Sequence, residues 1–425
     1  MLTHKELQDL RDKYLGPSLR LAYDEPLHIV RGGEQYLFDA DGNQYLDCVN
    51  NVQHVGHCHP RVVAAARRQY GTLNTNTRYL SADVMRYAKN LIDTLPEGLE
   101  VCFFTNSGSG SNDLALRLAR HFMGSKETIV FGAAYHGHLS SLIEISPYKH
   151  VGPGGSGPPD FVYTVPAPDP FRGKYRGPDC TGDYVQEVQR VIARINRKGL
   201  RVSALVVEAI MGCGGQLPIP DGLLQGAFEL VRKAGGLCIA DEVQIGFGRI
   251  GSHFWGSENC GVAPDIVTMG KPMGNGHLLS AVVTTHQIAD TFNNGMEYFN
   301  SFGGNPVSCA VRQAVLDVIE DEALQENALL VGSHLLDQLN TLRSKHDLIG
   351  DVRGAGLFIG VELVDDRCSL GPAGNDADVL INIMKEKGFL LASDGPDHNV
   401  IKIKSPMVFT KANADLLVKT LDECI

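Results

Sequence analysis

The stretches LCIADEVQIGFGRIG, at residues 237–251, and DIVTMGKPMGNG, at residues 265–276, set the pattern from which the fold is predicted. Each begins with a short, largely apolar run and then turns polar, the first at Asp241 and the second at Lys271. The segment before the first run, LLQGAFELVRKAGG, has helical spacing and ends in glycine, which is typical of a helix terminus. Apolar strands that alternate with helices predict a mostly parallel sheet covered on both faces.

The same alternation extends outward from about residue 99 to residue 300. Further strands are predicted at VCFFTN, ETIVFG, SALVVEAI and LLSAVVTT, with helices at SNDLALRLARHF and VQEVQRVIARINRKG. The segment 151–183 is rich in Gly and Pro, and we predict a long surface loop there. Ligands of parallel sheets bind at the carboxyl ends of the strands, so the polar residues that end these strands are the first candidates for chemistry.

The two ends of the chain have a different pattern. Residues 28–49 predict a short antiparallel meander with GG and DGN turns, and Pro60 precedes a predicted helix at 61–70. From residue 308 onward we predict a long helix, a strand pair around VRGAGLFIGVEL, a second helix and the strand VIKIKSP. We therefore predict an N-terminal segment at 1–57 that joins a small α+β domain at 308–425, with a large domain at 58–307 between them.

Composition excludes several functional classes. The 425 residues are 43% hydrophobic and 20% charged, as in an ordinary globular protein. A net charge of −11 without runs of basic residues argues against nucleic acid and anionic membranes as partners. No apolar run approaches the roughly 18 residues of a membrane span, and the first 16 residues lack the apolar core of a signal peptide. The ten cysteines form no CxxC or Cys/His ligand pattern, so we expect reduced thiols, no metal and a cytoplasmic location.

Four motifs carry candidate chemistry. Ser107, Gly108 and Ser109 lie between a strand and a helix, where free backbone N–H groups can bind a phosphate; a plain turn with a serine cap is the alternative. The aromatic Tyr135, with His136, follows the next strand and can stack on a flat ring, although taken alone this motif favours a packed surface tyrosine.

The other two motifs are the residues that open this section. Asp241 at a strand end can pair with a protonated ring nitrogen, or instead cap a helix or bind a metal. Lys271 among small and apolar residues can act as a nucleophile, or be an exposed turn residue. A phosphate loop, a stacking aromatic, an Asp and a Lys in this order are the parts of a pyridoxal 5′-phosphate (PLP) site, so we predict that Lys271 holds PLP as a Schiff base. The GxGxxG match at 246–251 is not followed by a helical pattern, which argues against dinucleotide binding.

The motifs together resemble the class III, fold-type I PLP-dependent aminotransferases. The resemblance rests on DEVQIGFGRIG with GKPMGNG, and on DGNQYLDCVN, GHCHP, NSGS, YHG, FGGNP and RGAGL, which span most of the chain. It implies an α/β fold with a mostly parallel seven-stranded sheet in the large domain and a smaller α+β domain. It also implies a homodimer or tetramer whose active site lies at the subunit interface.

The resemblance further implies a set of cofactor-binding residues: Ser107, Gly108, Ser109, Tyr135, His136, Glu208, Asp241, Val243, Gln244, Lys271 and Ser301. Tyr135 would stack on the ring, Asp241 would bond its nitrogen, and Val243 would lie against its face. Gln244 would lie near the phenolic oxygen, and Ser301 would reach the phosphate from a neighbouring subunit. Lys271 and Asp241 are the predicted catalytic residues.

One departure from the family pattern bears on the reaction. Members that use glutamate as amino donor carry a Glu at the position of Cys213, where it masks the carboxylate-binding arginine that matches Arg353. Without that Glu, we expect Arg353 to be permanently available to an anion. Gly110 also replaces a usual Glu, and Ala209 replaces a usual Pro.

The stretches NNVQHVGH at 50–57 and LNTNTRY at 73–79, with EAIMGCGG and NPVSCAV, resemble the phospho-lyase branch of the family. That branch acts on O-phosphoethanolamine or 5-phosphohydroxylysine. The resemblance implies β-elimination, with acetaldehyde, ammonia and phosphate as products from phosphoethanolamine. An ω-aminotransferase that uses pyruvate or 2-oxoglutarate and a non-enzymatic PLP-binding regulator stay open as alternatives. The candidates for the substrate phosphate are Arg78, Thr77, His54, Arg353 and Lys404.

Overall fold

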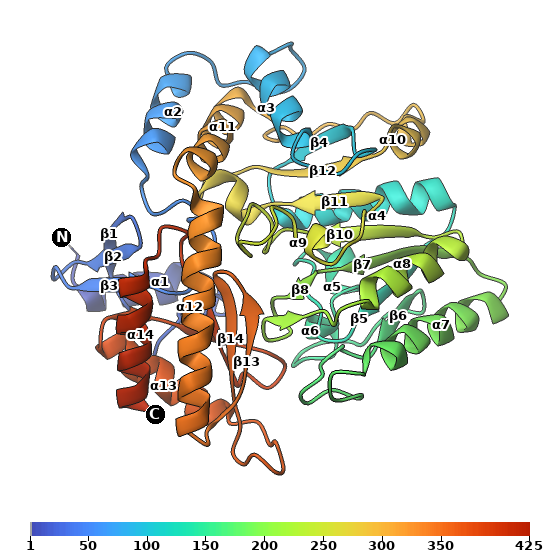
Figure 1. Ribbon diagram of the computed structural model, residues 1–425. Coiled ribbons are helices and arrows are strands. Elements are labelled where there is room, and N and C mark those ends of the chain that lie inside the picture. The colour runs from blue at the N-terminus through green and yellow to red at the C-terminus, as the bar shows by residue number, and fades with distance from the viewer. Residues whose placement is uncertain (1) are drawn as a thin grey trace.

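A seven-stranded sheet forms the centre of the protein (Figure 1), for which a computed structural model describes residues 2–425. In spatial order the strands are β4 (Val101–Thr105), β12 (Ser280–Thr284), β11 (Ile266–Met269), β10 (Leu237–Asp241), β7 (Val202–Val207), β5 (Glu127–Phe131) and β6 (Val162–Val165). Only β12 runs antiparallel to its neighbours, and every pairing from β11 to β6 is parallel. The predicted α/β fold with a mostly parallel sheet is therefore confirmed.

Helices cover both faces of this sheet because its strands are apolar on both sides. On β5, Ile129 and Phe131 pack with α7 (Thr181–Arg197) and α8 (Leu223–Lys233). The residue between them, Val130, packs on the opposite face with α4 (Gly108–Met123) and α10 (His286–Phe292). This alternation is the two-residue period of a strand applied to a doubly covered sheet.

The edge strand β6 corrects one prediction. We predicted a continuous surface loop over 151–183, but Val162–Val165 pairs in parallel with β5, and α7 begins at Thr181. The strand has only four residues between proline-rich segments, so its signal is too short to stand out from the loop composition. Tyr163 is almost fully buried against α7, and this burial explains why the run is ordered as a strand.

The C-terminal region is a second layer of helices on an antiparallel sheet. Its helices are α11 (Pro306–Asp321), α12 (Leu324–Lys345), α13 (Gly374–Glu386) and α14 (Lys411–Cys424). Its sheet has the order β13 (Ile349–Ala355), β14 (Phe358–Leu363), β17 (Val400–Ile403) and β16 (Ala392–Asp394). The strand pair, the helix after it and the strand VIKI are confirmed, but the one predicted long helix is two helices, and β16 and α14 were not predicted.

The N-terminal meander shares a sheet with the C-terminal region. It consists of β1 (Ile29–Gly33), β2 (Tyr36–Asp39) and β3 (Gln44–Asp47), and it follows helix α1 (His4–Tyr14). The edge of β3 pairs in parallel with β15 (Phe389–Leu390), which lies more than 300 residues later in the chain. This pairing places the N-terminal meander in one sheet with a strand of the C-terminal region, and the domain bounds 1–57 and 308–425 stay a prediction.

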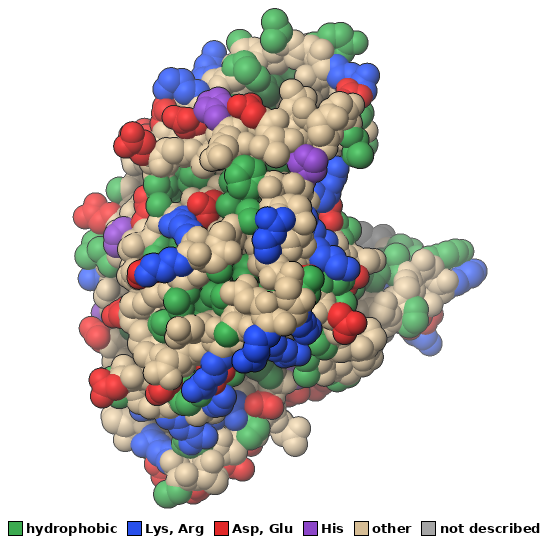
Figure 2. All heavy atoms as spheres, turned by 90° about the vertical axis from the view of Figure 1, so that its right-hand side faces the viewer, with side chains coloured by type: hydrophobic (Ala, Val, Ile, Leu, Met, Phe, Trp, Pro, Cys, Tyr) green, Lys and Arg blue, Asp and Glu red, His purple; other side chains and the backbone are tan. Residues whose placement is uncertain are grey.

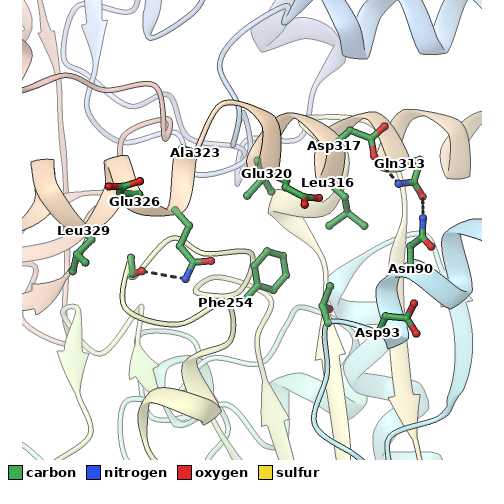
Figure 3. Close-up of a pocket in the computed structure, with 14 residues that line it drawn as sticks. Asn90, Asp93, Phe254, Gln313, Leu316, Asp317, Glu320, Ala323, Glu326 and Leu329 are labelled. Carbon is green, nitrogen blue, oxygen red and sulfur yellow. Dashed lines mark hydrogen bonds between the residues drawn. The ribbon is translucent and has the colours of Figure 1, made fainter.

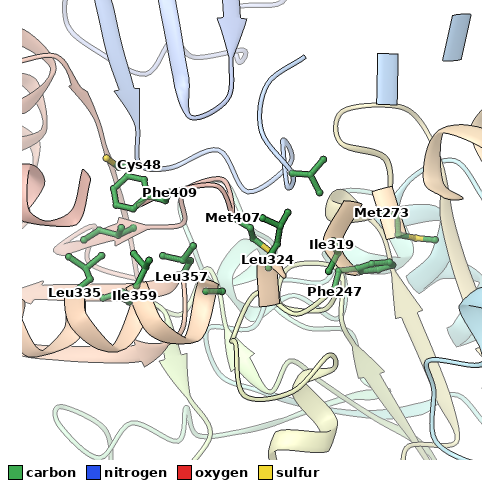
Figure 4. Close-up of a cluster of buried hydrophobic side chains, with 14 of the residues drawn as sticks. Cys48, Phe247, Met273, Ile319, Leu324, Leu335, Leu357, Ile359, Met407 and Phe409 are labelled. Carbon is green, nitrogen blue, oxygen red and sulfur yellow. The ribbon is translucent and has the colours of Figure 1, made fainter. Parts of the chain in front are cut away.

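One continuous apolar cluster connects the parts of the chain. It extends from α2 (Pro60–Tyr70) and α3 (Ala82–Ile92) along α11 and α12 to the small sheet. Figure 4 shows part of it, with Met273 and Phe247 near one end and Phe409 and Cys48 near the other. Because Met273 lies two residues after Lys271, the turn that carries this lysine is anchored in the core.

The described part of the chain has two further surface properties. None of the helices in residues 2–425 has the length and apolarity needed to cross a bilayer. Figure 2 shows Lys and Arg side chains grouped on the face that includes α7 and α8. The exposed members near the end of α7 and the starts of β5 and β7 are Lys126, Arg194, Arg197, Lys198 and Arg201. They lie at the amino ends of the parallel strands, opposite the strand ends that hold the candidate site.

Candidate active site

The predicted cofactor residues converge at the carboxyl ends of the sheet strands. They line a cavity of about 190 Å³ whose walls follow β4, β5, β7, β10 and β11. Its lining residues are Ser107, Gly108, Ser109, Asn112, Tyr135, His136, Gly137, His138, Glu208, Asp241, Val243, Gln244 and Lys271. Every predicted cofactor residue except Ser301 is therefore in one place, because parallel strands bring their carboxyl ends to the same edge.

The Gly/Ser loop forms the start of helix α4. Ser107 is the N-cap residue, and its hydroxyl accepts a hydrogen bond from the Gly110 N–H at 3.0 Å. The N–H groups of Gly108 and Ser109 lie in the first turn, where helix geometry leaves them without an intrahelical acceptor. A Cβ at Gly108 would lie only 2.6 Å from Cγ1 of Val243, so glycine is required. The serine cap and a phosphate site therefore coexist, since the cap leaves the first N–H groups free.

Asp241 is held at the end of β10 by three N–H donors. Its Oδ2 accepts hydrogen bonds from Asn112 Nδ2 and His136 Nδ1, both at 2.8 Å. Its Oδ1 accepts from the backbone N–H of Val243 at 3.1 Å. Asn112 is itself fixed by Thr268 Oγ1, which donates to its Oδ1 at 2.5 Å. These contacts orient the carboxylate into the cavity.

Sequence reasoning missed Asn112. It lies four residues into α4, in NSGSGSN, where an asparagine looks like an ordinary helical polar residue. Only the approach of α4 to the ends of β10 and β11 makes it the partner of Asp241 and Thr268. Its position one helical turn after the phosphate loop is the signal that could have identified it.

Two buried polar atoms in the cavity lack a partner within the described residues, namely Nε2 of His136 and Oε2 of Glu208. Buried polar atoms are nearly always hydrogen-bonded, so these atoms indicate a polar group that is yet to bind. Burial raises the pKa of Glu208 well above its ordinary value, and the nearby Asp241 carboxylate raises it further. A flat heteroaromatic ring with polar substituents meets the requirements of the cavity, so the residues fit PLP.

Lys271 begins a short 3-10 turn, Lys271–Gly274, directly after β11. Its side chain is half-buried and lines the same cavity as Asp241 and Gly108. Tyr135 is also half-buried, and its ring packs edge-on against Tyr148 with centroids 6.3 Å apart. A reactive amine, a fixed carboxylate and an aromatic wall therefore face one cavity.

Lys404 is a buried lysine whose amine lies beside Gln244, at the edge of the cavity. The Nζ of Lys404 lies 3.3 Å from Gln244 Oε1 and 3.5 Å from Asp394 Oδ2. Asn51 donates to the same Gln244 oxygen at 3.2 Å. Burial lowers the pKa of Lys404 to about 8, although Asp394 partly offsets the effect. The small sheet therefore places the titratable amine of Lys404 at the edge of the cofactor cavity.

Comparison with known proteins identifies the family. The model of the class III aminotransferases matches residues 21–425. The chain belongs to the class III aminotransferase family. The mostly parallel seven-stranded sheet and the predicted cofactor residues at its strand ends agree with this assignment.

Several relatives of this class III family member are informative. It is 49% identical to an alanine–glyoxylate aminotransferase 2-like protein of Drosophila melanogaster, over 100% of this chain and 87% of the relative. It is 42% identical to ethanolamine-phosphate phospho-lyase homolog 1 of Caenorhabditis elegans, over 99% of this chain and 93% of the relative.

Solved structures give the same family. A phospholyase from Arthrobacter in complex with phosphoethanolamine has a TM-score of 0.93 and 39% identity, covering 98% of this chain and 99% of that chain. A PLP-bound amine transaminase from an uncultivated Pseudomonas species has a TM-score of 0.88 and 29% identity, covering 97% of this chain and 99% of that chain. The protein is thus a class III enzyme that depends on PLP.

Two of the predicted phosphate ligands, His54 and Arg353, differ from expectation. His54 is fully buried, with Nε2 2.7 Å from the Phe247 carbonyl oxygen and Nδ1 accepting from Arg249 Nη2 at 3.0 Å. Burial also holds its pKa well below the ordinary value, so His54 stays neutral and has no ring nitrogen to offer an anion. We therefore withdraw it from the phosphate candidates.

Arg353 is not permanently available, contrary to the prediction. Its Nη1 pairs with Glu362 and, at 3.1 Å, with Asp351, and its Nε donates to the Gly215 carbonyl at 2.9 Å. Asp351 and Glu362 are register partners on the β13–β14 hairpin, so the fold places both carboxylates beside the arginine. Cys213 does not mask Arg353, but acids from the arginine's own hairpin engage it instead.

The phosphate candidates Arg78 and Thr77 and the cofactor candidate Ser301 lie on the surface of their own chain. Arg78 pairs with Glu297 at 3.1 Å and stacks over Phe299, whose ring centroid is 4.4 Å away. Thr77 and Ser301 are exposed and do not line the cofactor cavity. Ser301 lies instead beside a hollow of about 320 Å³ that includes residues 74–76. None of these three residues lines the cofactor cavity of its own chain.

A larger cavity, of about 810 Å³, lies elsewhere (Figure 3). It is bounded by α3, α11, α12 and the loop at Phe254, and Asp93, Asp317, Glu320 and Glu326 line it. It contains none of the predicted cofactor or phosphate residues. Size alone would therefore have identified the wrong site.

Proposed function

We propose that this class III enzyme is a phospho-lyase that eliminates phosphate from O-phosphoethanolamine and yields acetaldehyde, ammonia and inorganic phosphate. The observation that carries the proposal is the buried Lys404 amine at the edge of the cofactor cavity, beside Gln244. A cation there suits a substrate phosphate, whereas Arg353, which a keto acid would need, is held by Glu362 and Asp351. The phospho-lyase relative and the phosphoethanolamine-bound neighbour support the same assignment.

The proposal gives each cavity residue a role toward PLP. The first-turn N–H groups of Gly108 and Ser109 would bind its phosphate, and the carboxylate of Asp241 would pair with its ring nitrogen. Lys271 would hold it covalently until the substrate amine displaces the lysine and frees Nζ, and Tyr135 would cover its face. When bound, PLP withdraws electrons from the substrate carbon that bears the amine.

The protein residues then control two bond-breaking events. The Nζ of Lys271 accepts the proton from the carbon that bears nitrogen, as a general base. The electron pair of that C–H bond forms a double bond to the next carbon, whose C–O bond breaks with its electrons leaving on phosphate. The ammonium of Lys404 stabilises the departing phosphate oxygen. Water then converts the released enamine into acetaldehyde and ammonia.

A homodimer, or a tetramer built from it, completes the proposed site. The segments around residues 73–80 and 296–302 expose large apolar side chains, among them Leu80, which is 99% exposed, and Phe302. Exposed apolar surface of this kind is typical of a protein interface. Because Ser301, Thr77 and Arg78 lie in the same two regions, a second copy seated there would bring them to its partner's cavity.

Amino transfer is the second candidate, favoured by the 49% identity to an alanine–glyoxylate aminotransferase 2-like protein. Both reactions begin with removal of the same proton by Lys271. They differ in whether a leaving group on the next carbon is expelled. A longer phosphorylated amine, 5-phosphohydroxylysine, is the alternative substrate for the elimination.

The deciding experiment uses purified protein with PLP and phosphoethanolamine but no keto acid. We expect phosphate and acetaldehyde to appear in equal amounts, and the Lys271→Ala variant to release neither. A parallel reaction with alanine and glyoxylate measures amino transfer. Amino transfer without phosphate release would reject the lyase assignment and leave the family intact, and phosphohydroxylysine in the same assay tests the longer substrate.

A further inference from the structure

Arg312 is a buried arginine on α11 that has no carboxylate partner among residues 2–425. Its side chain is only 1% exposed, and Nε and Nη1 have no partner within the described chain. Burial without a counter-ion lowers the pKa of Arg312 to about 9. A buried unpaired charge costs free energy, so the contacts that Arg312 does make need an explanation.

Those contacts are to the loop that follows Lys271. The Nη2 of Arg312 donates to the carbonyl oxygen of His277 at 3.1 Å and to that of Leu279. The guanidinium also packs directly on Gly274, where a Cβ would lie 2.9 Å from Nη2. The turn Lys271–Gly274 and the loop leading to β12 are therefore in contact with one cation.

A second α11 residue holds the same loop. Ser308 lies four residues before Arg312, so both side chains lie on one helix face. The Ser308 hydroxyl donates to the Leu278 carbonyl at 2.9 Å and accepts from His277 Nε2 at 2.9 Å. Together the two residues bond to three consecutive residues, 277–279.

The other side of the loop is attached to the N-terminal segment. Asn275 has a left-handed backbone, with φ of 47°, and its Oδ1 accepts from the Val55 N–H at 3.0 Å. Its Nδ2 donates to the Gly56 carbonyl at 2.7 Å. The backbone after Lys271 is thus held from two sides, whereas the lysine side chain makes no hydrogen bond of its own within the described residues.

We propose that Arg312 is a positioning residue for Lys271. By holding the carbonyls of His277 and Leu279, it fixes the turn from which the lysine side chain extends, and so sets the place of Nζ relative to Asp241. The inference rests on the proposed role of Lys271, and Arg312 itself does not touch the reacting atoms. An arginine suits this task because one planar group donates to two carbonyls, and its charge strengthens both bonds.

The test compares Arg312→Met and Arg312→Lys with the wild-type holoenzyme. Wild-type protein is first reduced with borohydride, and pyridoxyl-Lys271 is identified by peptide mass spectrometry. If the label lies on another residue, the proposed function fails before Arg312 is tested. Amide hydrogen exchange over residues 270–280, the visible band of the bound cofactor, kcat and KM are then measured.

We expect Arg312→Met to exchange faster over residues 272–280 and to lose about tenfold in kcat, because small displacements of a reacting group are costly. KM should stay within about twofold, since no substrate contact is removed. Arg312→Lys should recover part of the loss because an ammonium can still donate to these carbonyls. Unchanged exchange, cofactor band and kcat in a folded Arg312→Met variant would overturn the proposal.

Two further variants separate positioning from stability. Arg249 is also fully buried, and it donates to the carbonyls of Leu357 and Ser405 and to His54 Nδ1, but it makes no direct hydrogen bond to residues 271–280. Arg249→Met should lower the melting temperature without selectively raising exchange over 272–280, whereas equal changes in both variants would contradict the inference. If Arg312→Met does not fold, Ser308→Ala is tested instead, because it removes the neighbouring bonds to the loop. Amide exchange over residues 272–280 should then be faster than in wild type. Protection equal to wild type would reject the proposal.

Discussion

Lys404 and Gln244 meet at the edge of the cofactor cavity, with the Lys404 Nζ 3.3 Å from the Gln244 Oε1. The lysine follows the last strand of the small sheet, and the glutamine follows β10 of the large sheet. Their contact brings a buried cation from one part of the fold to the cofactor site of another. The proposed elimination rests on this contact, because the Lys404 ammonium would stabilise the departing phosphate.

Replacing Lys404 with Met should weaken phosphoethanolamine binding. The loss of one charge-assisted bond, worth about 1.5 kcal/mol or more, corresponds to a KM increase of at least about tenfold. Phosphate release measured against substrate concentration checks this result. Lys402→Met is the matched control, because Lys402 also faces Asp394, at 3.4 Å, but is more exposed. Equal effects of the two substitutions would contradict a specific role for Lys404.

The pH dependence of kcat/KM should reflect the same amine. Burial lowers the pKa of Lys404 to about 8, so its ammonium is present below that pH and is lost as the pH rises through it. We therefore expect kcat/KM for phosphoethanolamine to fall above about pH 8. Lys404→Arg keeps its charge and should move that fall to higher pH. A pH profile that is identical in the two proteins would assign the fall to another group.

Asp241→Asn should reduce kcat by about 100-fold or more and weaken PLP retention, because a neutral amide cannot balance a protonated ring nitrogen. Turnover and spectroscopic titration with PLP measure the two effects. Glu242→Gln is the neighbouring control: Glu242 accepts bonds from the Gly256 and Ser257 N–H groups and serves the fold. It should cost about 1 kcal/mol of unfolding free energy and leave PLP binding unaltered.

Glu362→Gln should increase amino transfer to a keto acid by several-fold, because it removes the main carboxylate partner of Arg353. Transfer from alanine to glyoxylate is the assay. Asp397→Asn is the control, since Asp397 pairs with Arg172 at 2.8 Å and not with Arg353. A change confined to Asp397→Asn, or no gain in Glu362→Gln, would show that Glu362 does not restrain the arginine.

Leu80→Asp should dissociate the proposed homodimer. Its side chain is 99% exposed in the single chain, and a carboxylate would be costly to bury at an apolar interface. Light scattering after size-exclusion chromatography measures the mass. Leu416→Asp, on α14 and 52% exposed, is the control that should leave the mass unchanged. A Leu80→Asp protein that keeps the wild-type mass would move the interface elsewhere.

Local chain chemistry was enough to predict the alternating strands and helices and the residues at the strand ends. Asp241, Lys271 and the Ser107–Ser109 loop were predictable because every parallel strand delivers its last residues to the same edge. The motifs NSGS, YHG, DEVQ and GKPMGNG carried the same information, since their residues line the cavity at that edge. The short strand β6 was missed because four residues do not generate a period that outweighs the proline-rich flanks.

Three-dimensional packing decided which polar side chains are free. His54 and Arg353 look like anion ligands in the chain, but burial against Phe247 and Arg249 occupies the first, and the β13–β14 register pairs the second with Glu362. Asn112 and Arg312 are ordinary helical residues until their helices pack against the strand ends and the Lys271 loop. The physical reason is that a hydrogen-bond partner far along the chain is determined by how the elements pack, which local sequence does not encode.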